Sequence, residues 1–245
     1  MKFLTLGKDH PTIYKSATML ADYINNKGLP CTTTIDCMDK DIKIRWGVST
    51  YPRVEDTIYN DPKLISLSAN KNSLNKLLKG NGIHCVDFYK DDMPEKYPVI
   101  VRRTIVGGGG KGIVICRNEE EFKPLFGNYW AYWFKFDFEL GVHLLGGNVS
   151  RVFKKIKDQD EDEFPIRNVK NGYHYSLVSV DTYKKLPKLM STIFEVFPIQ
   201  MSRFDIGWDS ENKVYRVIES NCCPILMNNQ NTLIDYGEFL YEKLK

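Results

Sequence analysis

The sequence lacks the features of several common protein classes. Its six cysteines include no C-x-x-C pair and its four histidines are scattered, so a zinc site is not expected. No apolar run approaches the roughly 20 residues that span a bilayer, and the first ten residues lack the apolar core of a signal peptide. We therefore expect a cytoplasmic protein with reduced thiols and no membrane partner.

The chain also lacks a strong excess of charge of one sign. Its 34 Lys and Arg residues and 31 Asp and Glu residues leave a net charge of +3, which is too small and too dispersed to indicate nucleic acid binding. No internal repeat or low-complexity tract is present. At 245 residues with 42% hydrophobic content, the chain can bury a substantial core in one domain or in two closely packed ones.

Two apolar runs near the end of the chain predict a β-hairpin, because the polar residues 210–213 between them indicate a turn. Glu219 and Asn221 are two positions apart, so they point to one face of their strand. Folding about the turn brings Asp205 roughly opposite Glu219. Three hard oxygen ligands could then hold Mg²⁺ beside substrate phosphates. A hairpin with a merely polar, solvent-facing side is the alternative that this pattern alone leaves open.

A glycine-rich segment lies about a hundred residues upstream. An apolar strand over residues 98–101 leads into Arg102, the run Gly-Gly-Gly-Gly-Lys-Gly occupies residues 107–112, and a β-branched run follows. This hairpin tip can place bare backbone N–H groups against an anion. The segment lacks the residue order of a P-loop and the helix of a dinucleotide fingerprint. Five glycines and Lys111 favour a phosphate contact over a merely flexible tip.

The periodicity of the remaining segments predicts mixed secondary structure. Helices are expected over residues 12–26, 71–79, 118–126 (with Asn118 as N-cap), 181–197 (with a stop or kink at Pro187) and 232–244. Strands are expected over residues 2–7, 42–46, 84–89, 98–104 and 112–116, and within 129–157, with breaks at Asp137 and at residues 146–147.

The acidic hairpin and the glycine tip together resemble the ATP-grasp superfamily, over roughly residues 67 to 245. The resemblance implies an α+β fold in which two lobes, residues 67–131 and 132–245, grip ATP. The β-α-β pattern of residues 1–66 resembles an abbreviated form of the parallel unit that precedes this domain in the family.

The resemblance also implies roles for individual residues. One or two Mg²⁺ ions, with Mn²⁺ as a substitute, would be bound by Asp205, Glu219 and Asn221. ATP would contact Lys76, Arg102, Gly108, Gly109, Gly110, Lys111, Tyr132, Trp133, Phe134, Glu139, Lys155 and Arg203. Within this set the backbone of residues 132–134 would meet adenine, and Glu139 the ribose. The catalytic residues would be Arg203, Lys155 and Arg102, which offset charge on the transferred phosphoryl group.

The sequence departs from the family pattern at three places. Arg102 stands where the family has Lys. The replacement keeps the positive charge but exchanges a compact ammonium group for a planar guanidinium. Gly141 stands where many relatives have Arg. Residues 222–225, Cys-Cys-Pro-Ile, replace a small residue, any residue, Pro and Gly. The last two departures lie near where an acceptor substrate would bind.

The function that the resemblance implies is ATP-dependent, ADP-forming ligation of a carboxylate to an amine or a thiol through an acyl phosphate. Its substrates would be small-molecule or peptide carboxylates and amines, and homodimers are common in the family. A nucleotide-binding regulator without ligase activity and a phosphotransferase are the alternatives, since both would share the nucleotide-site residues.

Overall fold

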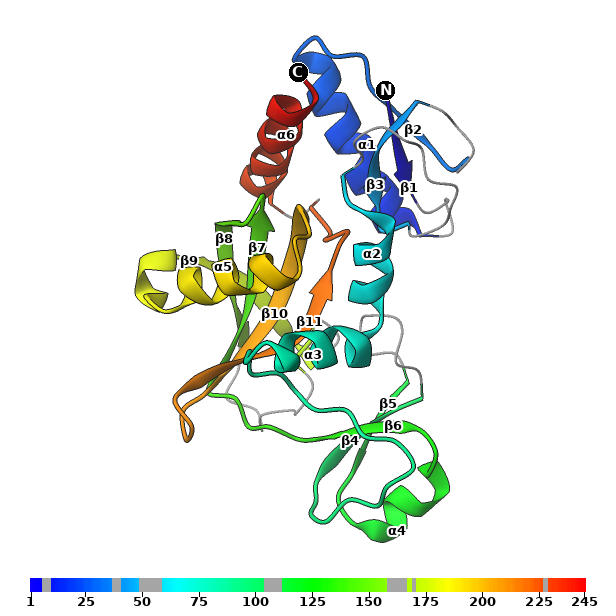
Figure 1. Ribbon diagram of the computed structural model, residues 1–245, viewed down its shortest axis with the longest axis vertical. Coiled ribbons are helices and arrows are strands. Elements are labelled where there is room, and N and C mark those ends of the chain that lie inside the picture. The colour runs from blue at the N-terminus through cyan, green and yellow to red at the C-terminus, as the bar shows by residue number, and fades with distance from the viewer. Residues whose placement is uncertain are drawn as a thin grey trace.

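The structure of the protein is a computed structural model that describes residues 1–5, 10–36, 41–48, 59–103, 112–157, 167–168, 171–226 and 229–245. Within these residues it contains three β-sheets, one of five strands and two of three strands. Figure 1 shows the sheets stacked along the long axis, with the five-stranded sheet in the middle. No helix of the described part is long and apolar enough to cross a membrane.

The N-terminal sheet is parallel. Its strands, in the order β2-β1-β3, are β1 (Lys2–Thr5), β2 (Thr32–Thr34) and β3 (Ile42–Trp46). Between β1 and β2 runs α1 (Pro11–Asn26), as its period of 3.6 predicts. The short strand β2 was not predicted, because three threonines carry no alternation of apolar and polar residues.

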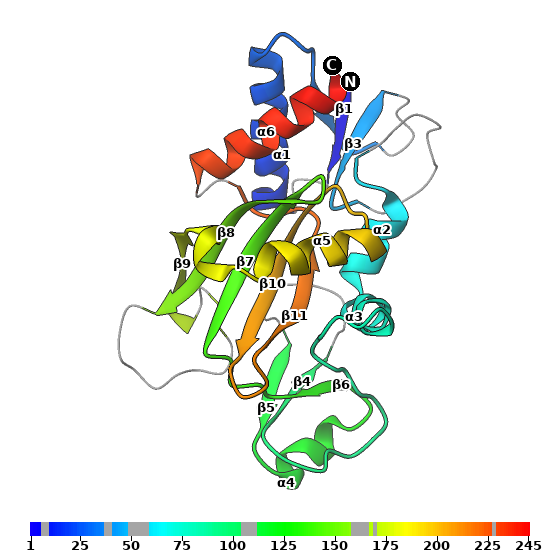
Figure 2. The ribbon, with the colours of Figure 1, turned by 60° about the vertical axis from the view of Figure 1, so that its left-hand side comes forward.

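The first helix of the chain packs against the last, α6 (Gln230–Leu244), and the two share one hydrophobic core. Gly237 permits this close approach, since a Cβ at that position would lie 2.3 Å from Cδ1 of Tyr23. The Tyr23 hydroxyl donates a hydrogen bond to Glu238 at 2.5 Å. As a result the two ends of the chain lie near each other (Figures 1 and 2).

The five-stranded sheet is antiparallel in the order β11-β10-β7-β8-β9. Its strands are β7 (Phe138–Leu145), β8 (Asn148–Lys157), β9 (Tyr173–Val178), β10 (Met201–Asp209) and β11 (Val214–Asn221). One face is apolar and packs against α3 (Lys71–Gly80) and α5 (Leu186–Val196). Figure 2 shows α5 lying across this face. The opposite face carries the charged residues of the candidate site.

The third sheet is antiparallel in the order β5-β4-β6. Its elements are β4 (Val99–Arg102), β5 (Ile113–Cys116), α4 (Glu119–Phe122), η1 (Lys123–Leu125) and β6 (Tyr129–Tyr132). The Asn118 side chain accepts a hydrogen bond from the Glu121 N–H at 2.9 Å, so the predicted N-cap is confirmed. Val99, Val101, Cys116, Phe122 and Trp130 form its own small core.

Two predicted elements differ in the structure, and one helix is additional. Residues 84–89 form no regular strand and make only isolated bridges, from Cys85 to Val217 and from Tyr89 to Trp130. The helix predicted over residues 181–197 is divided into η3 (Val180–Tyr183) and α5, and Pro187 lies in the first turn of α5, where a proline fits a helix. An additional helix, α2 (Pro62–Ala69), was not predicted.

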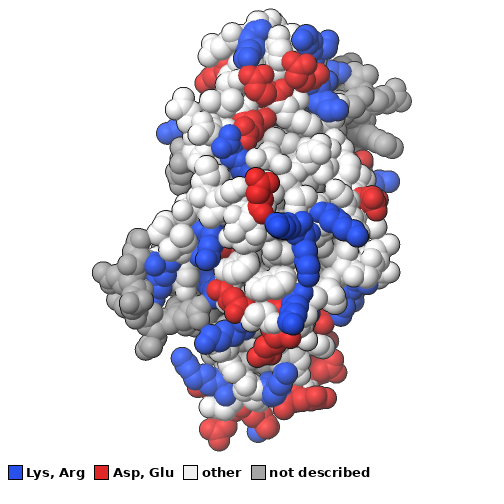
Figure 3. Space-filling view, turned by 90° about the vertical axis from the view of Figure 1, so that its left-hand side faces the viewer, with Lys and Arg blue, Asp and Glu red and all other residues white. Residues whose placement is uncertain are grey.

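The surface carries both signs of charge. On the face shown in Figure 3, Lys and Arg side chains alternate with Asp and Glu side chains, without a large area of one sign. This distribution agrees with the nearly balanced composition.

Candidate functional site

The two strands of the last hairpin pair in the predicted way. Asp205 on β10 lies directly opposite Glu219 on β11, and Arg203 lies opposite Asn221. On its other side, Asp205 pairs with Gly141 of β7. Opposite residues of an antiparallel sheet share a face, so Glu219, Asp205 and Gly141 form a row across three strands.

Lys155 of β8 reaches Asp205 of this row from two strands away. Its Nζ lies 2.9 Å from Oε2 of Glu139 and 2.9 Å from Oδ2 of Asp205, and all three side chains are largely buried. Its side chain extends past β7 to reach Asp205 on β10. Burial disfavours the charged ammonium, but the carboxylates of Asp205 and Glu139 outweigh it and raise the pKa of Lys155. Lys155 is therefore a buried cation that joins two acids.

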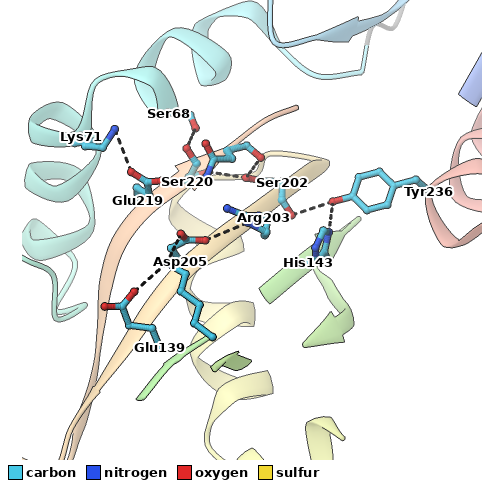
Figure 4. A network of polar contacts seen from close by, with 12 residues as sticks. Ser68, Lys71, Glu139, His143, Ser202, Arg203, Asp205, Glu219, Ser220 and Tyr236 are labelled. Carbon is cyan, nitrogen blue, oxygen red and sulfur yellow. Dashed lines mark hydrogen bonds and ion pairs between the residues drawn. The ribbon is translucent and has the colours of Figure 1, made fainter. Parts of the chain in front are cut away.

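Asp205 is held between two cations. Nε of Arg203 lies 3.1 Å from its Oδ1, and Lys155 contacts its Oδ2. Burial would raise the pKa of Asp205, but Arg203 and Lys155 lower it below its ordinary value. Asp205 is therefore a carboxylate at neutral pH. Figure 4 shows Arg203 and Asp205 pointing toward one another on β10.

Glu219 is paired with a residue that the sequence analysis missed. Nζ of Lys71, the first residue of α3, lies 3.1 Å from Oε2 of Glu219 (Figure 4). Nδ2 of Asn221 donates to Oε1 at 3.3 Å, which confirms that Glu219 and Asn221 share a face. Lys76, the lysine predicted for the nucleotide, is exposed on the same helix. The structure therefore brings Lys71, and not Lys76, to the acidic residues.

Arg102 ends β4 and lies in the field of Glu219. Its Nε is buried without a hydrogen-bond partner in the described part of the chain. Burial lowers the pKa of Arg102, and Glu219 opposes this by favouring the charged form. A buried guanidinium donor without a partner is costly, and a phosphate oxygen is the kind of acceptor that would satisfy it.

Residues 132–134 comprise the end of β6 and the beginning of the segment that leads to β7 in another sheet. The Trp133 N–H donates to the Pro98 carbonyl at 3.3 Å. The ring of Phe134 stacks on that of Phe136 with centroids 5.8 Å apart. Phe136 in turn covers Gly207 of β10, where a Cβ would lie 2.4 Å from its ring. This segment is anchored to both sheets through backbone and aromatic contacts.

The predicted phosphate contacts Gly108, Gly109, Gly110 and Lys111 lie outside the described residues. The strands that flank them pair as predicted, with Arg102 opposite Ile113. The Arg103 N–H donates to the Gly112 carbonyl at 3.1 Å and extends this ladder.

A buried polar network fixes the end of β11. The Ser68 hydroxyl, from α2, donates to the Ser220 carbonyl at 3.0 Å, and the hydroxyls of Ser202 and Ser220 lie 2.6 Å apart (Figure 4). Ser220 stands between Glu219 and Asn221. The network therefore holds the backbone that carries both predicted metal ligands.

His143 has a structural environment, as its place among apolar residues of a strand predicts. Its Nδ1 lies 3.0 Å from the Tyr236 hydroxyl of α6. Burial, with a smaller contribution from Arg203, lowers its pKa to about 3. The imidazole is neutral at physiological pH. Cys85, Cys116 and Cys222 are likewise buried, as expected for small core residues.

The residues present fit a magnesium nucleotide. Two carboxylates and one amide oxygen donor stand together, and oxygen donors of this kind suit Mg²⁺. No cluster of three or more His, Cys, Asp or Glu side chains occurs in the described ranges, so the third protein ligand would be the Asn221 amide and phosphate oxygens would complete the set. Lys71, Lys155, Arg203 and Arg102 surround these ligands with positive charge.

No protein-family model and no curated protein sequence matches the chain, but solved structures do. The structure of ATP-grasp ligase PsnB complexed with minimal precursor, Mg and ADP is 10% identical at a TM-score of 0.69, over 100% of this chain and 96% of that chain. The chain has the ATP-grasp fold. In another complex of PsnB with minimal precursor, the match covers 77% of this chain and 64% of that chain.

Two further ATP-grasp structures match nearly end to end. D-alanine–D-alanine ligase from Bacillus anthracis complexed with ATP is 10% identical at a TM-score of 0.67, over 100% of this chain and 98% of that chain. Macrocyclase MdnC bound with precursor peptide MdnA, from Microcystis aeruginosa MRC, is 10% identical at a TM-score of 0.67, over 99% of this chain and 98% of that chain. The ATP-grasp fold is thus confirmed by matches that span nearly the whole of both chains, and at this identity the similarity establishes the fold.

Proposed function

We propose that this protein is an ATP- and Mg²⁺-dependent, ADP-forming ligase that joins a carboxylate to an amine or a thiol through an acyl phosphate. One observation carries the proposal: Asp205 and Glu219 are in register at one face of the sheet, and four cationic side chains surround them. Phosphoryl transfer needs an aligned phosphate and neutralised charge rather than covalent help from the protein.

Each group of residues would have a distinct part. Asp205, Glu219 and Asn221 would hold one or two Mg²⁺ ions, with Mn²⁺ as a substitute, and the metal would neutralise charge on the phosphates. Arg102, Lys155 and Arg203 would offset charge on the transferred group. The adenine would lie against the linker of residues 132–134, and Glu139 would meet the ribose. The glycines 108–110 and Lys111 would contact the triphosphate.

Lys155 would do more than neutralise charge. Because it bridges Glu139 and Asp205 at 2.9 Å each, it ties the proposed ribose acid to the proposed metal ligand. A fixed cation at this position stabilises developing negative charge without reorganisation. Lys71 would act in the same way beside Glu219.

The substrates would be a peptide or small-molecule carboxylate and an amine. PsnB and MdnC were solved with precursor peptides, and the Bacillus anthracis enzyme is a ligase of D-alanine, so both sizes of substrate fit this fold. We place the reaction in the cytoplasm and propose a homodimer. The domain division at residue 66, and the lobes 67–131 and 132–245, also remain our proposal.

The test is magnesium-dependent ADP release from ATP in the presence of a pool of amino acids and acidic peptides. Glu219→Ala and Asp205→Ala should each lower kcat by about two to three decades, as for other preorganised charge-stabilising groups. Glu211→Ala is the matched control, since Glu211 is an exposed acid in the turn of the same hairpin. If both site variants keep near-normal turnover while all proteins are folded, the proposed site is wrong.

Product analysis separates the alternatives. A ligase yields inorganic phosphate and an amide or thioester, whereas a phosphotransferase yields a phosphorylated acceptor. ATP binding without ADP release over the whole pool would identify a nucleotide-binding protein without ligase activity.

A further inference from the structure

Tyr175 connects the edge of the five-stranded sheet to its charged centre. It lies on the edge strand β9, directly opposite Lys155 of β8. Nevertheless its ring centroid is 5.0 Å from Cζ of Arg203, which belongs to β10. Nζ of Lys155 lies 5.9 Å from the same centroid. The ring therefore extends inward across the sheet and contacts both cations that flank Asp205.

Gly141 provides the space for this arrangement. A Cβ at position 141 would lie 3.4 Å from Cε1 of Tyr175 and 3.4 Å from Cδ of Arg203. The ring and the arginine stem therefore meet over the bare backbone of β7. A longer side chain at 141 would occupy their place, so the glycine and the tyrosine form one unit.

The environment favours a neutral phenol beside the cations. Burial, followed by the charge of Asp205, raises the pKa of Tyr175. A neutral aromatic face attracts a guanidinium or ammonium group, and the attraction grows when the pair is desolvated. A planar guanidinium stacks on aromatic faces, so the ring limits the orientations that are open to Arg203.

We propose that Tyr175 is a positioning residue, which holds the Arg203 guanidinium and the Lys155 ammonium in the orientation that meets the phosphates of the nucleotide. This inference rests on the proposed function, because it assigns a partner to residues proposed to bind ATP. The ring acts through its face, so phenylalanine replaces tyrosine in this role and leucine does not.

The experiment is calorimetric binding of Mg²⁺ with the imido analogue of ATP, which requires no acceptor substrate. Tyr175→Leu should weaken binding about tenfold, the loss expected for a partly desolvated cation–π contact. Tyr175→Phe should stay within about twofold of the wild type. Tyr173→Leu is the matched control: Tyr173 lies on the same strand with Nζ of Lys157 at 5.9 Å from its ring, and it should also stay within about twofold.

A double-mutant cycle tests whether the effect passes through Arg203. In an Arg203→Lys background the planar guanidinium is absent, so Tyr175→Leu should cost less than about threefold. If Tyr175→Leu does not fold, Tyr175→Met makes the same test, because it keeps a long apolar side chain without an aromatic face.

Three results would overturn the inference: unchanged binding by Tyr175→Leu, equal losses for Phe and Leu, or an undiminished loss in the Arg203→Lys background. If the wild type binds the analogue and one of these occurs, only the inference on Tyr175 fails. If the folded wild type does not bind the analogue at all, the proposed function fails and this inference with it.

Discussion

Replacement of Lys155 by Met should destabilise the protein strongly, and the structure indicates by how much. Met keeps most of the apolar stem, so the change removes chiefly the ammonium group. That group lies 2.9 Å from both Glu139 and Asp205, and the side chains of all three residues are at most 12% exposed. The variant therefore leaves two buried carboxylates without their shared cation.

The expected loss is about 3 kcal/mol in the free energy of unfolding. Removing one partner of a buried ion pair costs about 3–5 kcal/mol. Asp205 retains Arg203 at 3.1 Å, which places the loss at the lower end of this range. Within the described residues, Glu139 has no other ion pair, so most of the loss arises there.

Equilibrium unfolding in urea, followed by tryptophan fluorescence and circular dichroism, measures this loss. With a slope of about 3 kcal/mol per molar urea, the midpoint should fall by about 1 M. Lys123→Met is the matched control, because Lys123 forms an exposed ion pair with Glu119 one helical turn away, and such pairs contribute little. Added Mg²⁺ should recover only the smaller part of the loss, which arises at Asp205, because Asp205 is a proposed metal ligand and Glu139 is not.

A loss below about 1 kcal/mol would contradict the reasoning. It would mean that the two acids are solvated or protonated without Lys155, and that the ion pair does not organise the site. Equal losses in Lys155→Met and Lys123→Met would lead to the same conclusion.

Two further predictions follow from the lysines of α3 and from His143. Lys71→Met should weaken binding of Mg²⁺–ATP by about tenfold, the value of one charge-assisted contact. Lys76→Met should leave this binding unchanged, because of these two lysines Lys71 is the one that contacts Glu219. Calorimetry measures both affinities, and a larger loss for Lys76→Met would favour Lys76 as the lysine that contacts the nucleotide. His143 is neutral in the fold with a pKa of about 3, against about 6.5 when unfolded, so the unfolded chain binds more protons in this range and stability falls as pH drops from 6.5 toward 3. The free energy of unfolding of His143→Gln should fall less steeply with pH over that window than that of the wild type, as measured by urea titrations at several pH values. An identical dependence on pH in the two proteins would show that the imidazole is protonated in the fold.

The sequence was sufficient for the parts of the site that depend on strand periodicity. The alternation in β11 places Glu219 and Asn221 on one face, and the turn at residues 210–213 predicts the hairpin. The N-cap at Asn118 was also predictable, since it depends on residues three positions apart. The pairing of Asp205 with Glu219 depends in addition on a β-bulge between Asp205 and Ile206, which shifts the register that the turn sets.

Contacts between distant elements were not predictable in this way. Lys155 meets Asp205 only because the fold places β8 and β10 on the two sides of β7. Tyr175 reaches Arg203 across the same strands. No local pattern in the sequence reports the order of strands in a sheet.

The position of Lys71 beside the acidic residues was not predicted, although the helical periodicity of the sequence contains a signal for it. Residues 71, 74, 75 and 78 follow the spacing of one helical face, and all four are buried. Leu74 and Leu78 mark that face as the inner one, so the periodicity alone places Lys71 inside and Lys76 outside. Helix α2 was missed although its start carries a signal. Pro62 stands at the beginning of the helix, where proline is favourable, and the Asp61 side chain accepts a hydrogen bond from the Lys63 N–H at 2.6 Å as a cap.

The packing of α1 on α6 has a consequence for synthesis on the ribosome. The apolar side of α1, including Leu20 and Ile24, is covered by residues that are translated more than 200 positions later. The apolar side of α1 in the first β-α-β segment is therefore uncovered during synthesis until α6 has emerged from the ribosome. Nascent chains arrested before residue 230 should recruit holdase chaperones at this surface, and emergence of residues 230–244 should end that association.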